Sequence, residues 1–186
     1  MSAYEIITVP DPVLKQIAQP VEHINDDVQL QLQRMQESLL EAKGIGLAAN
    51  QVNILNRVVL VNVPEGSWEF GEPEKNSALS IISQPTEGDN LRCMINPEII
   101  WESDELSVYE EGCLSIPGQY AHITRPAHVT VKYIDEKGDP QEAKVSGLES
   151  HCVQHEIDHL NGKLFIDYLS SLKRNIILRK FKKSRL

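Results

Sequence analysis

"HCVQHEIDHLNG", residues 151–162, contains the pattern His-Glu-x-x-His, which is typical of a metal site on a helix. Residues four apart lie on one face of an α-helix, so His155 and His159 can both turn a ring nitrogen toward one ion. Glu156 lies about 100° around the helix from His155, so it can reach a water on that ion without being a ligand. The stretch therefore predicts a helix at the centre of the fold, to which the rest of the chain must bring a third ligand.

The third ligand is not expected downstream. After His159 the chain contains no Glu, His or Cys, and Asp167 is its only acidic residue. The common zinc metalloproteases with this motif take a third ligand from a downstream His or Glu, as in the extended metzincin pattern. On the helix itself, His151 and Cys152 lie about 12 and 10 Å along the axis from His159. Ligands must converge at about 2.0 to 2.3 Å from one ion, so neither fits, and we expect Cys152 to be a small buried thiol.

Several upstream residues could complete the set: Cys93, Cys113, His23, His122 and His128. Cys113 lies in "EEGCLSIPG", residues 110–118, where Gly112 permits a close backbone approach and Pro117-Gly118 turns the chain. A Cys-His-His set leaves one coordination position open for water, as catalytic metal sites do. From the residues alone, Cys113 ranks only moderately above Cys93.

Secondary structure is expected on both sides of this helix. Apolar residues at alternating steps of four and three predict an amphipathic helix over residues 25–43, capped by Asn25 or Asp26 and ended by Gly44. We expect "GIGLAANQV" (44–52) to be a loop and residues 64–90, rich in Gly and Pro, to be a longer loop or insertion. The expected strands are "RVVLVNV" (57–63), "CMINPEII" (93–100), "LSVYEEGCLSI" (106–116), "AHVTVKYID" (127–135) and, after a turn at "DEKGD" (135–139), "QEAKVSG" (141–147).

These elements predict an α+β fold, in which antiparallel strands pack around the central HExxH helix, because they show no regular βαβ alternation. A length of 186 residues suits one core, so we expect a single domain over residues 1–186. A last helix is expected to begin near Ser170 or Ser171 and to run into a basic tail, residues 170–186.

Charge and cysteine content narrow the class of protein. The net charge of -9 argues against broad nucleic-acid binding, and so against DNA as a partner. Seven of the 18 basic residues lie in the last fourteen positions, which indicates either a solvated helix end or a contact to an anionic surface.

Three cysteines do not suggest a disulfide framework. The N-terminus lacks the features of a signal peptide, and no apolar run approaches the roughly 20 residues that span a bilayer. We expect a cytoplasmic protein with no membrane partner.

Three motifs stand in the order found in peptide deformylases: "GIGLAANQ" (44–51), "EGCLS" (111–115) and "HEIDHLNG" (155–162). HExxH alone would not identify a family, whereas the three motifs at these separations are specific. Much of the chain between Ile6 and Leu169 resembles that family, with a longer stretch at residues 64–90 than in the shorter bacterial members. The resemblance implies that Cys113 is the third metal ligand, beside His155 and His159.

The reaction that the resemblance implies is hydrolysis of the N-formyl group from the initiator methionine of newly made polypeptides, with release of formate. Glu156 would accept a proton from a metal-activated water and deliver it to the leaving nitrogen. The resemblance assigns the oxyanion donors to the Gln51 side-chain amide and the Leu114 backbone N–H.

The remaining site residues are expected around the substrate. Gly44, Ile45, Gly46 and Gly112 are expected beside the extended peptide backbone. Glu111 and Arg125 are expected to form an ion pair that steadies the segment carrying the cysteine. Tyr109 and His151 stand where family members often place aliphatic residues that line the methionine pocket, so the shape and polarity of that pocket should differ here.

The resemblance also implies a cofactor and a partner. It implies one divalent ion, Fe²⁺, although thiolate and imidazole ligands also suit Zn²⁺, Ni²⁺ and Co²⁺. Besides N-formyl-methionyl nascent peptides, it implies the ribosome as a partner of the basic C-terminal helix. Two functions are alternatives to deformylation. One is a metalloprotease that cuts internal peptide bonds, and the other is a protein that keeps a structural metal or a peptide groove without catalysis.

Overall fold

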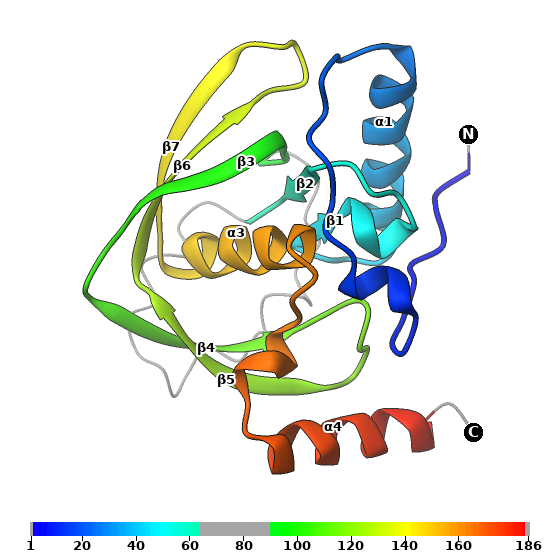
Figure 1. Ribbon diagram of the computed structural model, residues 1–186, viewed down its shortest axis with the longest axis vertical. Helices are drawn as coiled ribbons and strands as arrows, with labels where there is room; N and C mark the ends of the chain where they lie inside the picture. Colours follow the sequence, from blue (N-terminus) through cyan, green and yellow to red (C-terminus); the bar gives the residue numbers. More distant parts are fainter. Residues whose placement is uncertain (1, 64–89, 185–186) are drawn as a thin grey trace.

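Two antiparallel sheets enclose one central helix in the computed structural model, which describes residues 2–63 and 90–184 (Figure 1). The larger sheet has the order β1-β2-β3-β6-β7, and β4 and β5 pair as a separate hairpin. The strands are β1 (Gly46–Ala48), β2 (Val58–Val61), β3 (Arg92–Glu102), β4 (Leu106–Gly112), β5 (Tyr120–Pro126), β6 (His128–Ile134) and β7 (Pro140–Ser146). The expected α+β class with antiparallel strands is confirmed. The expected loop at 64–90 lies outside the described residues except for Asn90, and the single-domain expectation stays a prediction.

One helix lies inside this framework, and the others lie on its outside. They are α1 (Asp26–Glu41), α3 (Gly147–Leu160) and α4 (Ser171–Ser184), with short 3-10 turns η1 (Pro12–Lys15), η2 (Ala49–Val52) and η3 (Phe165–Tyr168). The helix expected over residues 25–43 is confirmed as α1, and the Asn25 side chain caps it by accepting from the Val28 N–H at 3.1 Å. The last helix begins at Ser171, as expected.

The motif helix α3 runs between the larger sheet and the β4-β5 hairpin (Figure 1). It begins at Gly147, whose φ of +56° lies in the region that favours glycine, so the chain can turn sharply out of β7. Eleven of its residues are buried, polar ones included. A helix enclosed on both sides can therefore present polar groups to an interior that excludes water.

Apolar packing fixes the position of α3. Val153, Ile157 and Leu160 belong to one core cluster with the inward-facing residues of the larger sheet. On the other side, Phe165 joins Ile116 and the C-terminal helix in a second cluster. Each fully buried aliphatic or aromatic side chain contributes about 1.5 to 3 kcal/mol, so the first cluster holds α3 against the larger sheet, and the second holds η3 and α4 against the β4-β5 hairpin.

Two local expectations were wrong. The segment 44–52 is not a loop throughout, because it forms β1 and then the turn η2. All three residues of β1 are buried, and such a short strand shows no alternation of apolar and polar residues. Strand β5 was not expected at all, since one of its two fully buried side chains is the charged Arg125 rather than an apolar residue.

Helix α4 packs against the body through Ile177 and Phe181 and leaves most of its basic residues exposed. No helix in the described ranges is both long and apolar enough to cross a membrane.

Candidate metal centre and active site

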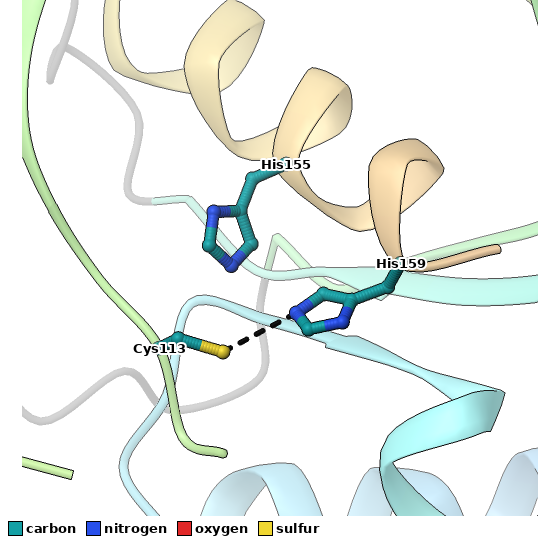
Figure 2. Close-up of side chains that lie close together, drawn as sticks. All are labelled: Cys113, His155 and His159. Carbon is teal, nitrogen blue, oxygen red and sulfur yellow. Dashed lines mark hydrogen bonds between the residues drawn. The ribbon is translucent and has the colours of Figure 1, made fainter. Parts of the chain in front are cut away.

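Three possible ligands meet where α3 faces the turn after β4. The Sγ of Cys113 and one nitrogen each of His155 and His159 all lie within 4.8 Å of one another, and the Cys113 Sγ is 3.2 Å from the His159 Nε2 (Figure 2). Ligands bound at about 2.0 to 2.3 Å from one ion stand roughly 3.5 Å apart, so these three atoms fit a single divalent cation. They form the one such group within residues 2–63 and 90–184.

The other candidate ligands lie elsewhere. Cys93 lies on β3 opposite Leu60, and burial raises the pKa of its thiol to about 11. His128 lies 3.6 Å from Glu105 at the protein surface. Cys152 is a buried thiol on α3, as expected, and its Sγ lies 3.3 Å from the Ile45 carbonyl oxygen. The ambiguity between Cys93 and Cys113 is therefore resolved by geometry, because only Cys113 lies beside the histidine pair.

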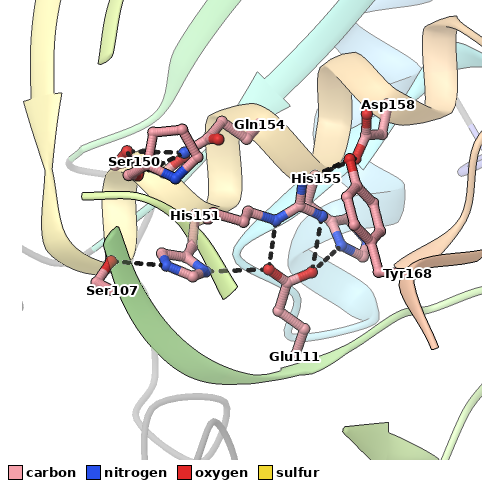
Figure 3. Close-up of polar contacts among 10 residues, drawn as sticks. Ser107, Glu111, Ser150, His151, Gln154, His155, Asp158 and Tyr168 are labelled. Carbon is pink, nitrogen blue, oxygen red and sulfur yellow. Dashed lines mark hydrogen bonds and ion pairs between the residues drawn. The ribbon is translucent and has the colours of Figure 1, made fainter. Parts of the chain in front are cut away.

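The Glu111 carboxylate lies directly behind this group and accepts four hydrogen bonds (Figure 3). Its Oε1 accepts from the Arg125 Nε at 2.6 Å and contacts the His151 Nδ1 at 3.0 Å. Its Oε2 accepts from the Arg125 Nη2 at 3.0 Å and contacts the His155 Nδ1 at 3.0 Å. Burial opposes the charged form, but the hydrogen bonds from His151, His155 and Arg125 outweigh it and hold the pKa of Glu111 well below its usual value.

This carboxylate orients the first histidine. Ionised Glu111 can only accept, so the His155 Nδ1 must carry the proton of that hydrogen bond. The His155 Nε2 is then the nitrogen that points toward Cys113 and His159 (Figure 2). Burial lowers the pKa of His155, but Cys113 and Glu111 outweigh it and leave the pKa well above its usual value. Burial lowers the pKa of His159 well below its usual value, with His155 as the next cause. The groups around His155 and His159 thus stabilise one positive charge at this site, and a divalent cation bound there would supply it.

Glu156 lies beside the same group, on the adjoining face of α3. It is 4% exposed, and its Oε2 has no hydrogen-bond partner within the described part of the chain. Burial raises the pKa of Glu156 to about 7. A carboxylate with that pKa and a free oxygen is suited to accept and return a proton near neutral pH.

Gln51 links the first motif to the cysteine segment. Its Oε1 accepts from the Ala48 N–H at 2.9 Å, and its Nε2 donates to the Ser115 Oγ at 3.1 Å while lying 3.6 Å from the Cys113 Sγ. The amide nitrogen thus faces the metal group. For the Leu114 backbone N–H, no acceptor is found among the described residues. Both donors stand beside the space that a substrate would enter.

A cavity of about 180 Å³ opens next to these groups. Nearly all of the residues that the sequence suggested line it: Gly44, Ile45, Gly46, Gln51, Tyr109, Glu111, Gly112, Cys113, Leu114, His151, His155 and Glu156. Leu148, Cys152, Pro117 and Tyr120 complete much of its apolar wall.

Arg125 and Glu111, which were expected around the substrate and as an ion pair, lie differently relative to the cavity. Arg125 does not line the cavity but lies behind Glu111, and its Nη1 donates to the Asp158 Oδ2 at 2.8 Å. Glu111 reaches the cavity wall, but both of its oxygens are already occupied by protein donors. A buried charge is tolerated only when it is paired in this way. The expected ion pair between the two residues is present, with a supporting role.

Sequence reasoning missed the residues that hold these groups in place. Asp158 lies inside the HExxH motif, about 60° around the helix from His155, and it accepts from Arg125 and from the Tyr168 hydroxyl. Ser107 lies 2.9 Å from the His151 Nε2, and Ser115 accepts from Gln51. The position of Ser115 within "EGCLS" was a signal for its role, whereas nothing in the sequence singled out Ser107 or Tyr168.

Comparison with known proteins points to one family. A family model described as polypeptide deformylase matches residues 3–175. The peptide deformylase of Rhizobium meliloti is 43% identical over 184 residues, covering 99% of this chain and 95% of the relative. The peptide deformylase of Brucella suis is 43% identical over 183 residues, covering 98% and 94%. The crystal structure of the Ehrlichia chaffeensis peptide deformylase in complex with actinonin superposes with a TM-score of 0.83 at 38% identity, covering 99% of this chain and 98% of that one.

Proposed function

The chain belongs to the polypeptide deformylase family and is an enzyme of that kind, and from this premise we propose that it hydrolyses the N-formyl group of newly made polypeptides at a divalent metal held by Cys113, His155 and His159. One observation carries the assignment of residues. A cysteine from the β4 turn converges on the histidine pair of α3, next to a buried carboxylate with a free oxygen. That arrangement leaves one side open to a cavity that can admit a substrate.

The proposed chemistry begins with a proton transfer. A divalent cation held by Cys113, His155 and His159 would lower the pKa of a bound water toward about 7 and so supply a nucleophile at neutral pH. Glu156 accepts the proton of that water through its free Oε2 and later delivers it to the leaving nitrogen. Because an amine leaves poorly without that proton, one carboxylate serves as both base and acid.

The oxyanion that forms on the formyl carbon needs fixed donors. We assign the Gln51 Nε2 and the Leu114 backbone N–H, which flank Cys113 from two different segments. The Gln51 amide is already held by Ala48 and Ser115, so it needs no reorientation when charge develops. Removal of one such donor typically lowers the rate by 10² to 10³.

We place the substrate in the cavity with its methionine side chain toward Tyr109, Leu148 and His151. Ile45 and Gly46, at the start of β1, line the cavity together with Gly112 at the end of β4, so an extended peptide can lie beside the backbones of both strands. The small volume of the cavity suits a single side chain of methionine size.

The metal and partner assignments extend this proposal. We assign Fe²⁺ as the working ion, although thiolate and imidazole donors also bind Zn²⁺, Ni²⁺ and Co²⁺. We assign the exposed basic face of α4 to a contact with the ribosome, where newly made chains emerge. A cytoplasmic location follows from that substrate.

One experiment tests the proposal. The protein is purified without oxygen, its metal is measured, and formate release from formyl-Met-Ala-Ser is compared with proteolysis of an unfolded protein. We expect one metal ion per chain, formate release, no proteolysis, and loss of formate release in Glu156→Ala. Formate release that survives Glu156→Ala would overturn the role of Glu156. Proteolysis without formate release would favour the metalloprotease, and metal without either activity would favour the non-catalytic protein.

A further inference from the structure

The buried ring of His151 is hydrogen-bonded at both of its nitrogens. It is 1% exposed, its Nδ1 lies 3.0 Å from the Glu111 Oε1, and its Nε2 lies 2.9 Å from the Ser107 Oγ (Figure 3). The ring also packs against Tyr109, with their centroids 4.6 Å apart. His151 lies one helical turn before His155, so both histidines reach the same carboxylate from the same helix face.

The direction of these hydrogen bonds follows from the acceptor. Both oxygens of the Glu111 carboxylate accept hydrogen bonds from the Arg125 guanidinium, as in an ion pair. The ionised carboxylate has no proton to donate, so it can only accept further hydrogen bonds. The His151 Nδ1 must therefore donate to Oε1, and the Nε2 shares a hydrogen bond with the Ser107 hydroxyl. The resulting chain runs from Ser107 through His151 to Glu111, and Glu111 then accepts from His155.

Each oxygen of Glu111 thus receives one Arg125 nitrogen and one histidine nitrogen. Without His151, the Oε1 would keep only the Arg125 Nε, and the carboxylate could rotate away from His155. The orientation of His155 matters because the other histidine of the pair has no comparable support. The His159 Nδ1 has no hydrogen-bond partner within the described residues.

The same geometry changes the expected character of the cavity wall. Since both ring nitrogens already bind protein groups, His151 presents ring carbon atoms to the substrate rather than a free polar group. A histidine in place of an aliphatic residue therefore leaves this part of the wall apolar.

We propose that His151 is a positioning residue for the metal centre: it holds the Glu111 carboxylate in the orientation that fixes His155. This inference rests on the proposed metal site. Removal of the His151 side chain should make the protein lose its metal faster, because groups that orient metal ligands typically raise the affinity for the metal about 10- to 100-fold. His151 acts one hydrogen bond further out, so we expect roughly a threefold to tenfold effect.

The test measures how fast the zinc-loaded full-length protein loses Zn²⁺ to a chelator. We expect His151→Ile, which has no donor, to lose Zn²⁺ about threefold to tenfold faster than the unaltered protein. His151→Asn places an amide N–H at the same bond count from the backbone, so it should stay within about twofold. The matched control is Tyr109→Leu, which changes the same cavity wall without touching Glu111 and should alter KM for formyl-Met-Ala-Ser but not Zn²⁺ loss.

Other outcomes would overturn the proposal. Equal Zn²⁺ loss in His151→Ile and the unaltered protein would do so, as would equal acceleration by Tyr109→Leu, which would indicate a packing effect. If His151→Ile does not fold, Ser107→Ala decides: it removes the hydrogen-bond partner of Nε2 and should give an intermediate rate, and an unchanged rate would refute the positioning role. Zn²⁺ binding that persists at full stoichiometry in Cys113→Ala would instead refute the proposed metal site.

Discussion

At the scale of single residues, Gly46 stands closest to the carboxylate on which the proposed reaction depends. A Cβ atom at this position would lie 2.2 Å from the Glu156 Oε1 and 2.9 Å from the Cys152 Sγ. Both distances are far below van der Waals contact, so the side chain of Glu156 must move. We predict that Gly46→Ala lowers kcat about 100-fold while the bound metal stays at one ion per chain, because small misplacements of a catalytic group cost rate rather than ligands. Assay of formate release beside metal analysis checks this, and loss of metal in step with activity would contradict it.

Glu156 also links protonation to stability. Its pKa rises from 4.5 in the unfolded chain to about 7 in the buried site, so the folded state gains relative stability when Glu156 is protonated. That contribution is complete below pH 4.5 and is lost as the pH rises through 7. The quantity to compare, in metal-free protein, is the free energy of unfolding of Glu156→Gln minus that of the unaltered protein. This difference should be about 3 kcal/mol larger at pH 8 than at pH 4.5. Urea unfolding with a chelator present measures this, and a constant difference across the range would refute it.

The residues that the sequence could reveal are those whose role depends on local spacing. His155, His159 and Glu156 follow from the period of the helix, and Cys113 follows from a motif. Without that motif, ligand chemistry and spacing could not separate Cys113 from Cys93, because that choice depends on which strand end the fold turns toward α3. His151 shows the same limit: its spacing placed it near the cavity, but only the positions of Ser107 and Glu111 show that its nitrogens are both occupied.

At the scale of elements, Arg125 joins the β4-β5 hairpin to α3. It is 3% exposed and binds Glu111 on β4 and Asp158 on α3, and its guanidinium lies 4.7 Å from the centre of the Tyr168 ring. We predict that Arg125→Met destabilises the protein by about 3 to 5 kcal/mol, because it leaves the buried Glu111 and the partly buried Asp158 without their shared cation. The control is Lys132→Met, which removes an exposed ion pair with Glu98 and should cost under about 1 kcal/mol. Similar losses in both variants by urea unfolding would contradict the prediction.

The same arginine explains why β5 escaped detection. Its fully buried positions are Ile123 and Arg125, so the inward face of this strand carries a charge where a pattern search expects an apolar residue. Strand β1 was missed for a different reason, since three buried residues cannot display a period. The strands with continuous or alternating apolar residues, β2 and β6, were predicted because their partners in the core are apolar as well.

At the scale of the whole molecule, charge is divided between the body and the C-terminal helix. All 27 acidic residues lie at or before Asp167, whereas seven of the 18 basic residues lie in the last fourteen positions. Within α4, Ile177 and Phe181 turn inward, and Lys173, Arg179, Lys180, Lys182 and Lys183 are exposed. A protein with net charge -9 thus exposes a group of basic side chains on α4, which lies alongside the β4-β5 hairpin (Figure 1).

This division predicts salt-dependent binding to the ribosome, whose surface is rich in phosphate. Reversal of three exposed charges, Lys180→Glu with Lys182→Glu and Lys183→Glu, should abolish co-sedimentation with ribosomes while formate release from a free tripeptide stays unchanged, because these residues lie on α4 and do not line the active cavity. In the unaltered protein, binding should weaken steeply between about 50 and 200 mM salt, as expected when lysines displace counterions from phosphates. Reversal of Lys132 on β6 with Lys144 on β7 provides a control of the same kind on the body. Binding that persists in the α4 variant, or that is lost equally in the control, would mean that α4 is only a solvated helix end.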